Sequence, residues 1–168
     1  MTIVSEAADV TDFNNCRTSF RATLPSGSSQ HDFSDEQFPY EAGVSYFVAY
    51  SNTFELCGWM VTKSMPESVK IEGICTHTDQ IKRKGALKAL VTRAVNMSLK
   101  GGKRGAVTLT NSSSDGGAAY TFLGFTDTGS GTMRLEAGNL PKAEWQEVEQ
   151  VPSKKGKKMW VTELKSIA

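Results

Sequence analysis

Two short segments carry residue types that can do chemistry in one shared cleft. The first is the basic turn at residues 82–88, Lys-Arg-Lys-Gly-Ala-Leu-Lys, which opens a stretch of helical apolar spacing. The first N–H groups of a helix have no internal partner and the helix dipole is positive there, so this turn predicts a phosphate site. In the second segment Tyr120 is followed four residues later by Gly124, which is typical of the end of a short helix. A phosphate site and a phenol facing one cleft indicate a protein that holds a phosphorylated carrier and does acyl chemistry at its far end.

A strand–helix–strand unit positions these two segments. The pattern predicts a strand over Val69–Thr76, a helix from about Lys84 to Lys100 that Gly101-Gly102 ends, and a strand over Arg104–Thr110 with Val107 and Leu109 inward. The helix has an apolar stripe at 3.6-residue spacing, made of Leu87, Leu90, Val91, Ala94 and Val95. A unit of this length predicts two parallel strands joined by a right-handed crossover.

Alternation along the first of these strands predicts two faces. Val69, Ile71 and Cys75 are expected on one face, and Lys70, Glu72, Ile74 and Thr76 on the other. The other expected elements are a strand at 2–4, a helix capped by Ser5, and a short helix at 116–123 that Gly124 ends in a left-handed conformation. Three hairpins are also expected, at 44–50 with 54–63, at 125–128 with 132–137, and at 145–151 with 159–164.

Size and composition limit the class of protein. The 168 residues predict one domain over 1–168, in which 138–168 forms a C-terminal β extension. A formal net charge of +1 argues against a strong bulk attraction to nucleic acid or membrane. Cys16, Cys57 and Cys75 are too few and too widely spaced for a disulfide scaffold or a zinc site, so no metal is expected. The first residues are not typical of a signal peptide, and no apolar run approaches a membrane span, so a cytoplasmic location is expected.

The order of elements and two stretches of sequence resemble the acetyl-CoA-dependent N-acetyltransferases of the GNAT superfamily. The stretches are IEGICTHTDQIKRKGALKAL at 71–90 and AAYTFLGF at 118–125. The family's phosphate motif, Q/R-x-x-G-x-G/A, fits in two registers. The first register begins at Lys82 and places Gly85 at the fourth position, with Leu87 where a second small residue is usual. The second register begins at Gln80 and places Arg83 where the first glycine is usual, with Gly85 at the last position. The first register agrees better with the apolar spacing of the helix.

The resemblance implies a mixed α/β (α+β) fold, with a mostly antiparallel twisted sheet, helices on both faces and a central parallel β-α-β unit. It also implies acetyl-CoA as cosubstrate, with the pantetheine arm entering a gap between two splayed strands. The implied coenzyme-binding residues are Ile74, Cys75, Thr76 and His77 on the strand side, Lys82, Arg83, Lys84, Gly85, Ala86, Leu87 and Lys88 at the helix start, and Asn111 after the next strand. Tyr120 is the implied general acid for the coenzyme sulfur, and Glu72 is the candidate base, directly or through water.

The leading hypothesis is therefore an acetyltransferase in which an amine attacks acetyl-CoA directly in a ternary complex. The acceptor is left open between a small molecule, a peptide or protein amine, and an aminoacyl-tRNA; the acidic, aromatic stretch 32–41 favours a cationic one. A homodimer is compatible with the sequence and no membrane partner is expected. Two alternatives remain: a non-catalytic acyl-CoA-binding or interaction module on the same fold, and a nucleic-acid-binding protein using the basic clusters at 82–88 and 154–158.

Overall fold

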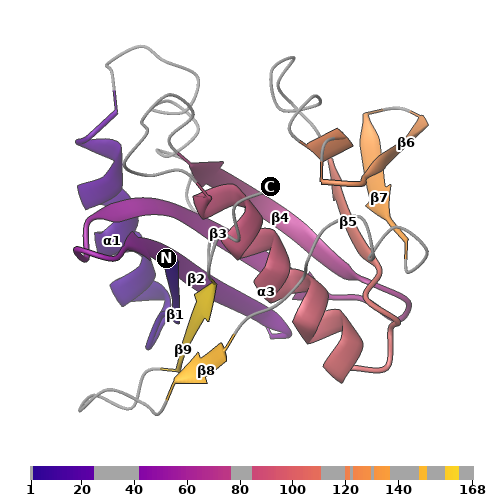
Figure 1. Ribbon diagram of the computed structural model, residues 1–168, viewed down its shortest axis with the longest axis horizontal. Helices are drawn as coiled ribbons and strands as arrows, with labels where there is room; N and C mark the ends of the chain where they lie inside the picture. Colours follow the sequence, from indigo (N-terminus) through magenta and orange to yellow (C-terminus); the bar gives the residue numbers. More distant parts are fainter. Residues whose placement is uncertain are drawn as a thin grey trace, which may run out of the picture.

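A single sheet runs through the molecule, and a helix packs on each of its faces. The structure is a computed structural model and describes residues 2–24, 42–76, 85–110, 120–121, 123–129, 131–136, 148–150 and 158–162. Within these ranges the sheet has nine strands in the order β6-β7-β5-β4-β3-β2-β1-β9-β8 (Figure 1). The strands are β1 (Thr2–Glu6), β2 (Val44–Ser51), β3 (Leu56–Ser64), β4 (Val69–Thr76), β5 (Val107–Thr110), β6 (Thr126–Gly129), β7 (Thr132–Leu135), β8 (Val148–Gln150) and β9 (Met159–Thr162). The helices are α1 (Val10–Arg21) and α3 (Ala86–Lys100).

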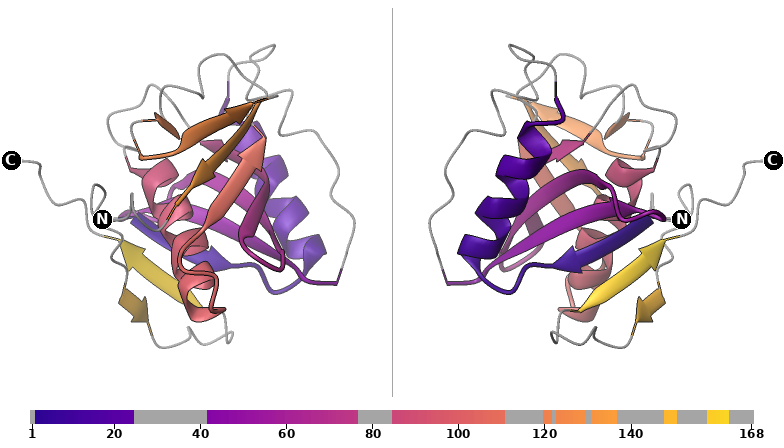
Figure 2. Two further views of the ribbon diagram at one scale, coloured as in Figure 1. Left: turned by 90° about the vertical axis from the view of Figure 1, so that its right-hand side faces the viewer. Right: turned by 90° about the vertical axis from the view of Figure 1, so that its left-hand side faces the viewer.

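The sheet is antiparallel except at its centre. There β4 and β5 run parallel and α3 connects them, as the strand–helix–strand pattern predicts. The left panel of Figure 2 shows α1 and α3 on opposite sides of the sheet. The predicted fold class is therefore confirmed: a mixed, mostly antiparallel sheet with helices on both faces and a central parallel β-α-β unit.

Helix α1 covers one face through aromatic side chains. The ring of Phe13 lies 5.1 Å from that of Tyr46 and 5.9 Å from that of Trp59, centroid to centroid, and Phe20 is buried in the same cluster. Arg17 is also buried here, with its guanidinium 5.3 Å from the centre of the Trp59 ring, an arrangement that favours a cation–π contact.

The cap of α1 differs from the sequence prediction. Ser5 lies in β1, and Asp9 is the N-cap residue, with its carboxylate accepting a hydrogen bond from the backbone N–H of Asp12 at 2.7 Å. Both residue types are good helix caps, so local chemistry could not choose between them. Pairing of β1 with β2, from Thr2↔Ser51 to Glu6↔Phe47, keeps Ser5 extended and moves the helix start along the chain.

Helix α3 covers the other face and forms the main core. Leu90, Val91, Ala94 and Val95 of the predicted apolar stripe are fully buried, and Leu87 is partly buried against the same cluster. The helix ends at Lys100 as predicted. It begins at Ala86 rather than at about Lys84, a residue outside the described ranges.

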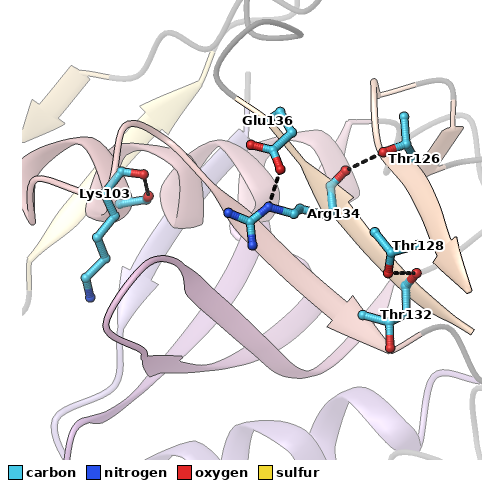
Figure 3. A network of polar contacts seen from close by, with 7 residues as sticks. Lys103, Thr126, Thr128, Thr132, Arg134 and Glu136 are labelled. Carbon is cyan, nitrogen blue, oxygen red and sulfur yellow. Dashed lines mark hydrogen bonds and ion pairs between the residues drawn. The ribbon is translucent and has the colours of Figure 1, made fainter. Parts of the chain in front are cut away.

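The β6–β7 hairpin lies beside β5 at one edge of the sheet. The hydroxyl groups of Thr126 and Thr128 donate hydrogen bonds to the carbonyl oxygens of Arg134 and Thr132, at 3.4 and 3.0 Å, and Arg134 forms an ion pair with Glu136 (Figure 3). The two threonine hydrogen bonds link β6 to β7, whereas the ion pair joins residues on the β7 side. The predicted hairpins at 44–63 and 125–137 are both confirmed. Most strand ends differ from the predicted ends by one or two residues.

The C-terminal hairpin β8–β9 extends the opposite edge of the sheet. β9 pairs antiparallel with β1, from Thr2↔Thr162 to Ser5↔Met159. Trp160 of β9 is buried between the ring of Phe47, 5.9 Å away, and the guanidinium of Arg93 on α3, 3.9 Å from the Trp160 ring centre. The hairpin predicted in this region is confirmed, whereas the single-domain organisation stays a prediction. Within the described ranges, no helix combines the length and apolar composition needed to cross a bilayer.

Candidate active site

The two central parallel strands separate part-way along their length. β4 pairs with β5 at Val69↔Val107, Lys70↔Thr108 and Ile71↔Leu109 only, although β4 continues to Thr76. In Figure 1 the two strands form a V that opens towards their carboxyl ends. From residue 72 onwards, the edge of β4 that faces β5 therefore pairs with no described strand.

A β-bulge marks the point of separation. On the β3 side Val61 pairs with Gly73 and Thr62 with Ile71, so Glu72 is an extra residue in β4. A bulge bends its strand and strengthens the local twist, which turns the end of β4 away from β5.

The bulge also reverses the predicted faces of β4 beyond residue 72. Val69 and Ile71 belong to the core beneath α3, but Cys75 belongs to the cluster beneath α1, and Ile74 packs against the α3 core. The prediction that Cys75 shares a face with Val69 and Ile71 is therefore wrong, as is the placing of Ile74 on the opposite face. Strict alternation holds only while each residue faces one partner, and the inserted residue shifts the phase.

Within the described residues, helix α3 begins with an N-cap residue that makes no side-chain hydrogen bond to the helix. Gly85 is its N-cap, at φ 94°, a left-handed conformation that favours glycine, and its carbonyl accepts the first helical hydrogen bond from Ala89 at 2.9 Å. Gly85 has no side chain that could accept a hydrogen bond from the N–H groups of Ala86, Leu87 and Lys88. Backbone donors at the positive end of a helix dipole are suited to binding an anion, and the phosphate site predicted here stays a prediction.

Tyr120 lies on the other side of the opening, after β5. The N–H of Phe125 bonds to the Tyr120 carbonyl at 3.0 Å, and Gly124 has φ 106°, which confirms Gly124 as a left-handed helix end. The Tyr120 ring is buried edge-on against Phe125, 5.7 Å between centroids. Burial raises the pKa of Tyr120 to about 12, with a smaller contribution from the ionised form of the nearby Cys75 thiol. The structure thus brings Tyr120 close to the end of β4.

Glu72 has a different setting from Tyr120. Its carboxylate oxygen lies 3.7 Å from the Lys70 ammonium nitrogen in a partly exposed ion pair. Within the described ranges, no hydrogen bond joins Glu72 to Tyr120. Glu72 is therefore the bulge residue with an accessible carboxylate, and its role as a base stays a prediction.

Comparison with known proteins agrees with this arrangement. No protein-family model and no curated protein matches the sequence. Among solved structures, a GNAT-family acetyltransferase from Staphylococcus aureus matches with a TM-score of 0.57 at 8% identity, over 82% of this chain and 99% of that chain. The ribosomal-protein-S18-alanine N-acetyltransferase from Escherichia coli matches with a TM-score of 0.52 at 20% identity, over 80% and 93%. The PaiA N-acetyltransferase from Thermoplasma acidophilum, solved in complex with coenzyme A, gives 0.52 at 16% identity, over 81% and 99%. This chain has the GNAT acetyltransferase fold.

Several predicted site residues of this GNAT fold lie outside the described ranges. They are His77, Lys82, Arg83, Lys84 and Asn111, together with the stretches 32–41 and 154–158. Their predicted roles stay predictions. Among the residues that the structure describes, no group of His, Cys, Asp and Glu side chains is suited to holding a metal ion.

Sequence reasoning missed the bulge that opens the site. The residues of β4 alternate well enough to read as a regular strand. The one signal was Gly73, because an isolated glycine within a strand pattern is typical of a bulge.

Proposed function

We propose that this protein transfers an acetyl group from acetyl-CoA to an amine. One observation carries the proposal, and it is the opening between β4 and β5 that starts at the Glu72 bulge. The start of helix α3 at Gly85 and the buried Tyr120 lie beside this opening. In this proposal the helix start binds phosphate, the edge of β4 beyond residue 71 binds the pantetheine arm, and Tyr120 is the proton donor near the end of that strand. A neighbour of the same fold was solved with coenzyme A, which supports the choice of donor.

The described residues fit the coenzyme at the start of α3. The N–H groups of Ala86, Leu87 and Lys88 would bind the pyrophosphate, and Lys88 would add a positive charge. Gly85 leaves room for close approach because it has no Cβ atom. Leu87 stands where the family usually has a small residue, and its partly buried side chain packs on the core. Lys82, Arg83 and Lys84 are proposed to add charge, including towards the 3′-phosphate.

The edge of β4 that faces β5 would hold the pantetheine arm. Backbone groups from Ile74 through Cys75 and Thr76 to His77 would pair with its amides as a neighbouring strand would. One N–H in this run would polarise the thioester carbonyl, a contact of the oxyanion type that contributes about 3 kcal/mol in other enzymes. Asn111, which follows β5, would hydrogen-bond the pantetheine or the acceptor.

The chemistry is a direct attack in a ternary complex. The amine nitrogen forms a bond to the thioester carbon while the carbon–sulfur bond breaks, so the amine must lose a proton and the sulfur must gain one. Tyr120 would donate the proton to sulfur, and Glu72 would accept the amine proton, directly or through water. The Tyr120 phenol keeps its proton at physiological pH, as an ordinary tyrosine does and as a general acid requires, and burial raises its pKa further, to about 12.

The proposed acceptor is an amine, and small and large acceptor molecules both remain in the proposal. The Escherichia coli neighbour is named for an alanine of a ribosomal protein, so the fold accommodates protein amines as acceptors. For this chain we keep a small molecule, a peptide or protein amine, and an aminoacyl-tRNA as acceptor classes. A cationic acceptor is preferred because of the acidic stretch 32–41, and the cytoplasm is the proposed location. A single domain over 1–168 with its β extension, and a homodimer, remain part of the proposal.

The test is a turnover assay with acetyl-CoA and a panel of amines that spans these classes, following thiol release. Turnover by the wild-type protein should fall by about 10² or more in Tyr120→Phe, while the affinity for acetyl-CoA changes little. Tyr50→Phe is the matched control, because its hydroxyl lies near Cys16, 3.9 Å from the sulfur, on the α1 side of the sheet. Unchanged turnover in Tyr120→Phe would remove Tyr120 from the chemistry. Tight coenzyme binding without turnover on any amine would instead favour a non-catalytic acyl-CoA-binding or interaction module.

A further inference from the structure

We infer that Gly58 is a positioning residue for the acyl donor, because its lack of a side chain lets β3 hold the end of β4 in place. This inference rests on the proposed function and adds a residue that the proposed site does not include. Gly58 is the partner of Thr76, the last residue of β4, and on its other side it is the partner of Ala49 in β2. It therefore lies directly behind the run of backbone that is proposed to bind the thioester.

The approach of the two strands at this point is too close for any side chain. A Cβ atom built on Gly58 would lie 2.6 Å from the Cys75 carbonyl oxygen, 2.8 Å from Cγ2 of Thr76 and 3.3 Å from Cα of Thr76. The shortest of these contacts is to a backbone atom, so no change of side-chain rotamer relieves it. Gly58 is not among the residues with positive φ, so its backbone conformation is open to other residues and the requirement for glycine is steric.

The resulting displacement falls on β4 rather than on β3. Cys57 and Trp59, which flank Gly58, are buried in the α3 and α1 clusters respectively, and this packing anchors β3 on both faces of the sheet. Ile74 and Cys75 pack on the same two clusters, but β3 is also paired with β2 on its far side at Gly58, whereas the end of β4 has no described strand on its β5 side to hold it. A side chain at residue 58 should therefore move Cys75 and Thr76 towards the opening, where the pantetheine arm is proposed to bind.

Two ligands separate this effect from a general loss of structure. Acetyl-CoA needs both the helix start and the β4 edge, whereas adenosine 3′,5′-bisphosphate has phosphates but no pantetheine or thioester. Gly58→Ala should weaken acetyl-CoA binding by about tenfold or more, because misplacement of a binding group by 1 Å has a large effect in enzyme sites. The affinity for the bisphosphate should stay within about twofold of the wild-type value. The control is Gly101→Ala at the far end of α3, where the tightest contact of a Cβ atom is with Met97 O at 3.2 Å, and Lys103 Cε and Ser98 O lie at 3.6 and 3.8 Å. It should change neither affinity.

Isothermal titration of the full chain measures the affinity for each ligand, and thermal unfolding shows whether each variant is folded. Equal acetyl-CoA affinity in wild type and Gly58→Ala, or equal weakening of both ligands, would overturn the inference. If wild type binds neither ligand, the proposed function itself fails. If Gly58→Ala does not fold, the Gly58→Ala/Thr76→Ser double variant removes the 2.8 Å contact and is compared with Thr76→Ser alone. The 2.6 Å contact with Cys75 O remains in the double variant, which should still bind acetyl-CoA more weakly. Equal affinity would overturn the inference, as would a double variant that does not fold, because Gly58 would then serve the whole fold.

Discussion

Alkaline pH should destabilise this protein partly through Tyr120, and Tyr120→Phe should remove that part of the effect. The buried phenol has its pKa raised to about 12, against about 10 for an ordinary tyrosine. The folded state therefore holds the proton more tightly than the unfolded state. The stabilisation is fully present below pH 10 and is lost as the pH rises from about 10 to about 12. At 1.36 kcal/mol per pKa unit, the difference amounts to about 2–3 kcal/mol.

The assay is urea unfolding of wild type and Tyr120→Phe at pH 8 and at pH 11.5. Lysine side chains and other tyrosines titrate in the same range, but their contribution is common to both proteins and cancels in the comparison. The variant should lose about 2 kcal/mol less than wild type between the two pH values. An identical loss in both proteins would show that Tyr120 titrates normally. The burial of the phenol described here would then be wrong, whereas its assignment as a proton donor would stand, because a phenol with an ordinary pKa is also neutral at physiological pH.

Three further predictions concern the helix start and the packing. Gly85→Glu places a negative side chain at the proposed phosphate site in a left-handed conformation, and titration with acetyl-CoA should give no heat; retained affinity would place the phosphate site elsewhere. Trp160→Ala removes a ring packed between Phe47 and Arg93 and should lower the free energy of unfolding by about 3–5 kcal/mol in urea, whereas a change below 1 kcal/mol would contradict the packing. Asp9→Ala removes the N-cap bond of α1 and should cost about 1 kcal/mol in the same experiment; no change would mean that water replaces the cap.

The elements that local sequence specifies were predicted well. The stripe from Leu87 to Val95 fixes a helix and its buried face, and Gly101 and Gly102 end it. The hairpin between β2 and β3 follows from two apolar runs separated by a polar turn. Each of these signals lies within a few residues of the structure it predicts, so no distant contact is needed to interpret it.

The features that the sequence did not reveal depend on contacts between distant segments. Glu72 is a bulge residue in the pairing of β4 with β3, and nothing in the alternation from Val69 to Thr76 records that pairing. Ser5 is extended because β1 pairs with β2 and β9. Gly58 stands in an apolar run as one small residue among others, and its importance depends on the carbonyl of Cys75 on the next strand.

In the candidate site too, short motifs predicted individual residues, whereas their arrangement depends on contacts between distant segments. The resemblance predicted Tyr120, Glu72 and the helix start at Gly85 as site residues from short motifs. The structure adds the separation of β4 from β5 and the nearness of Tyr120 to Cys75. Only the three-dimensional arrangement joins the motifs into one opening, because the two arms of that opening are separated by α3 in the sequence.

The measurement that tests the central claim most directly is isothermal titration of the purified protein with acetyl-CoA, with coenzyme A and acetate as comparisons. We expect a dissociation constant in the micromolar range for acetyl-CoA, at least as tight as for coenzyme A, and no binding of acetate alone. An absence of heat with both acetyl-CoA and coenzyme A, in protein shown to be folded, would contradict an acetyl donor site between β4 and β5.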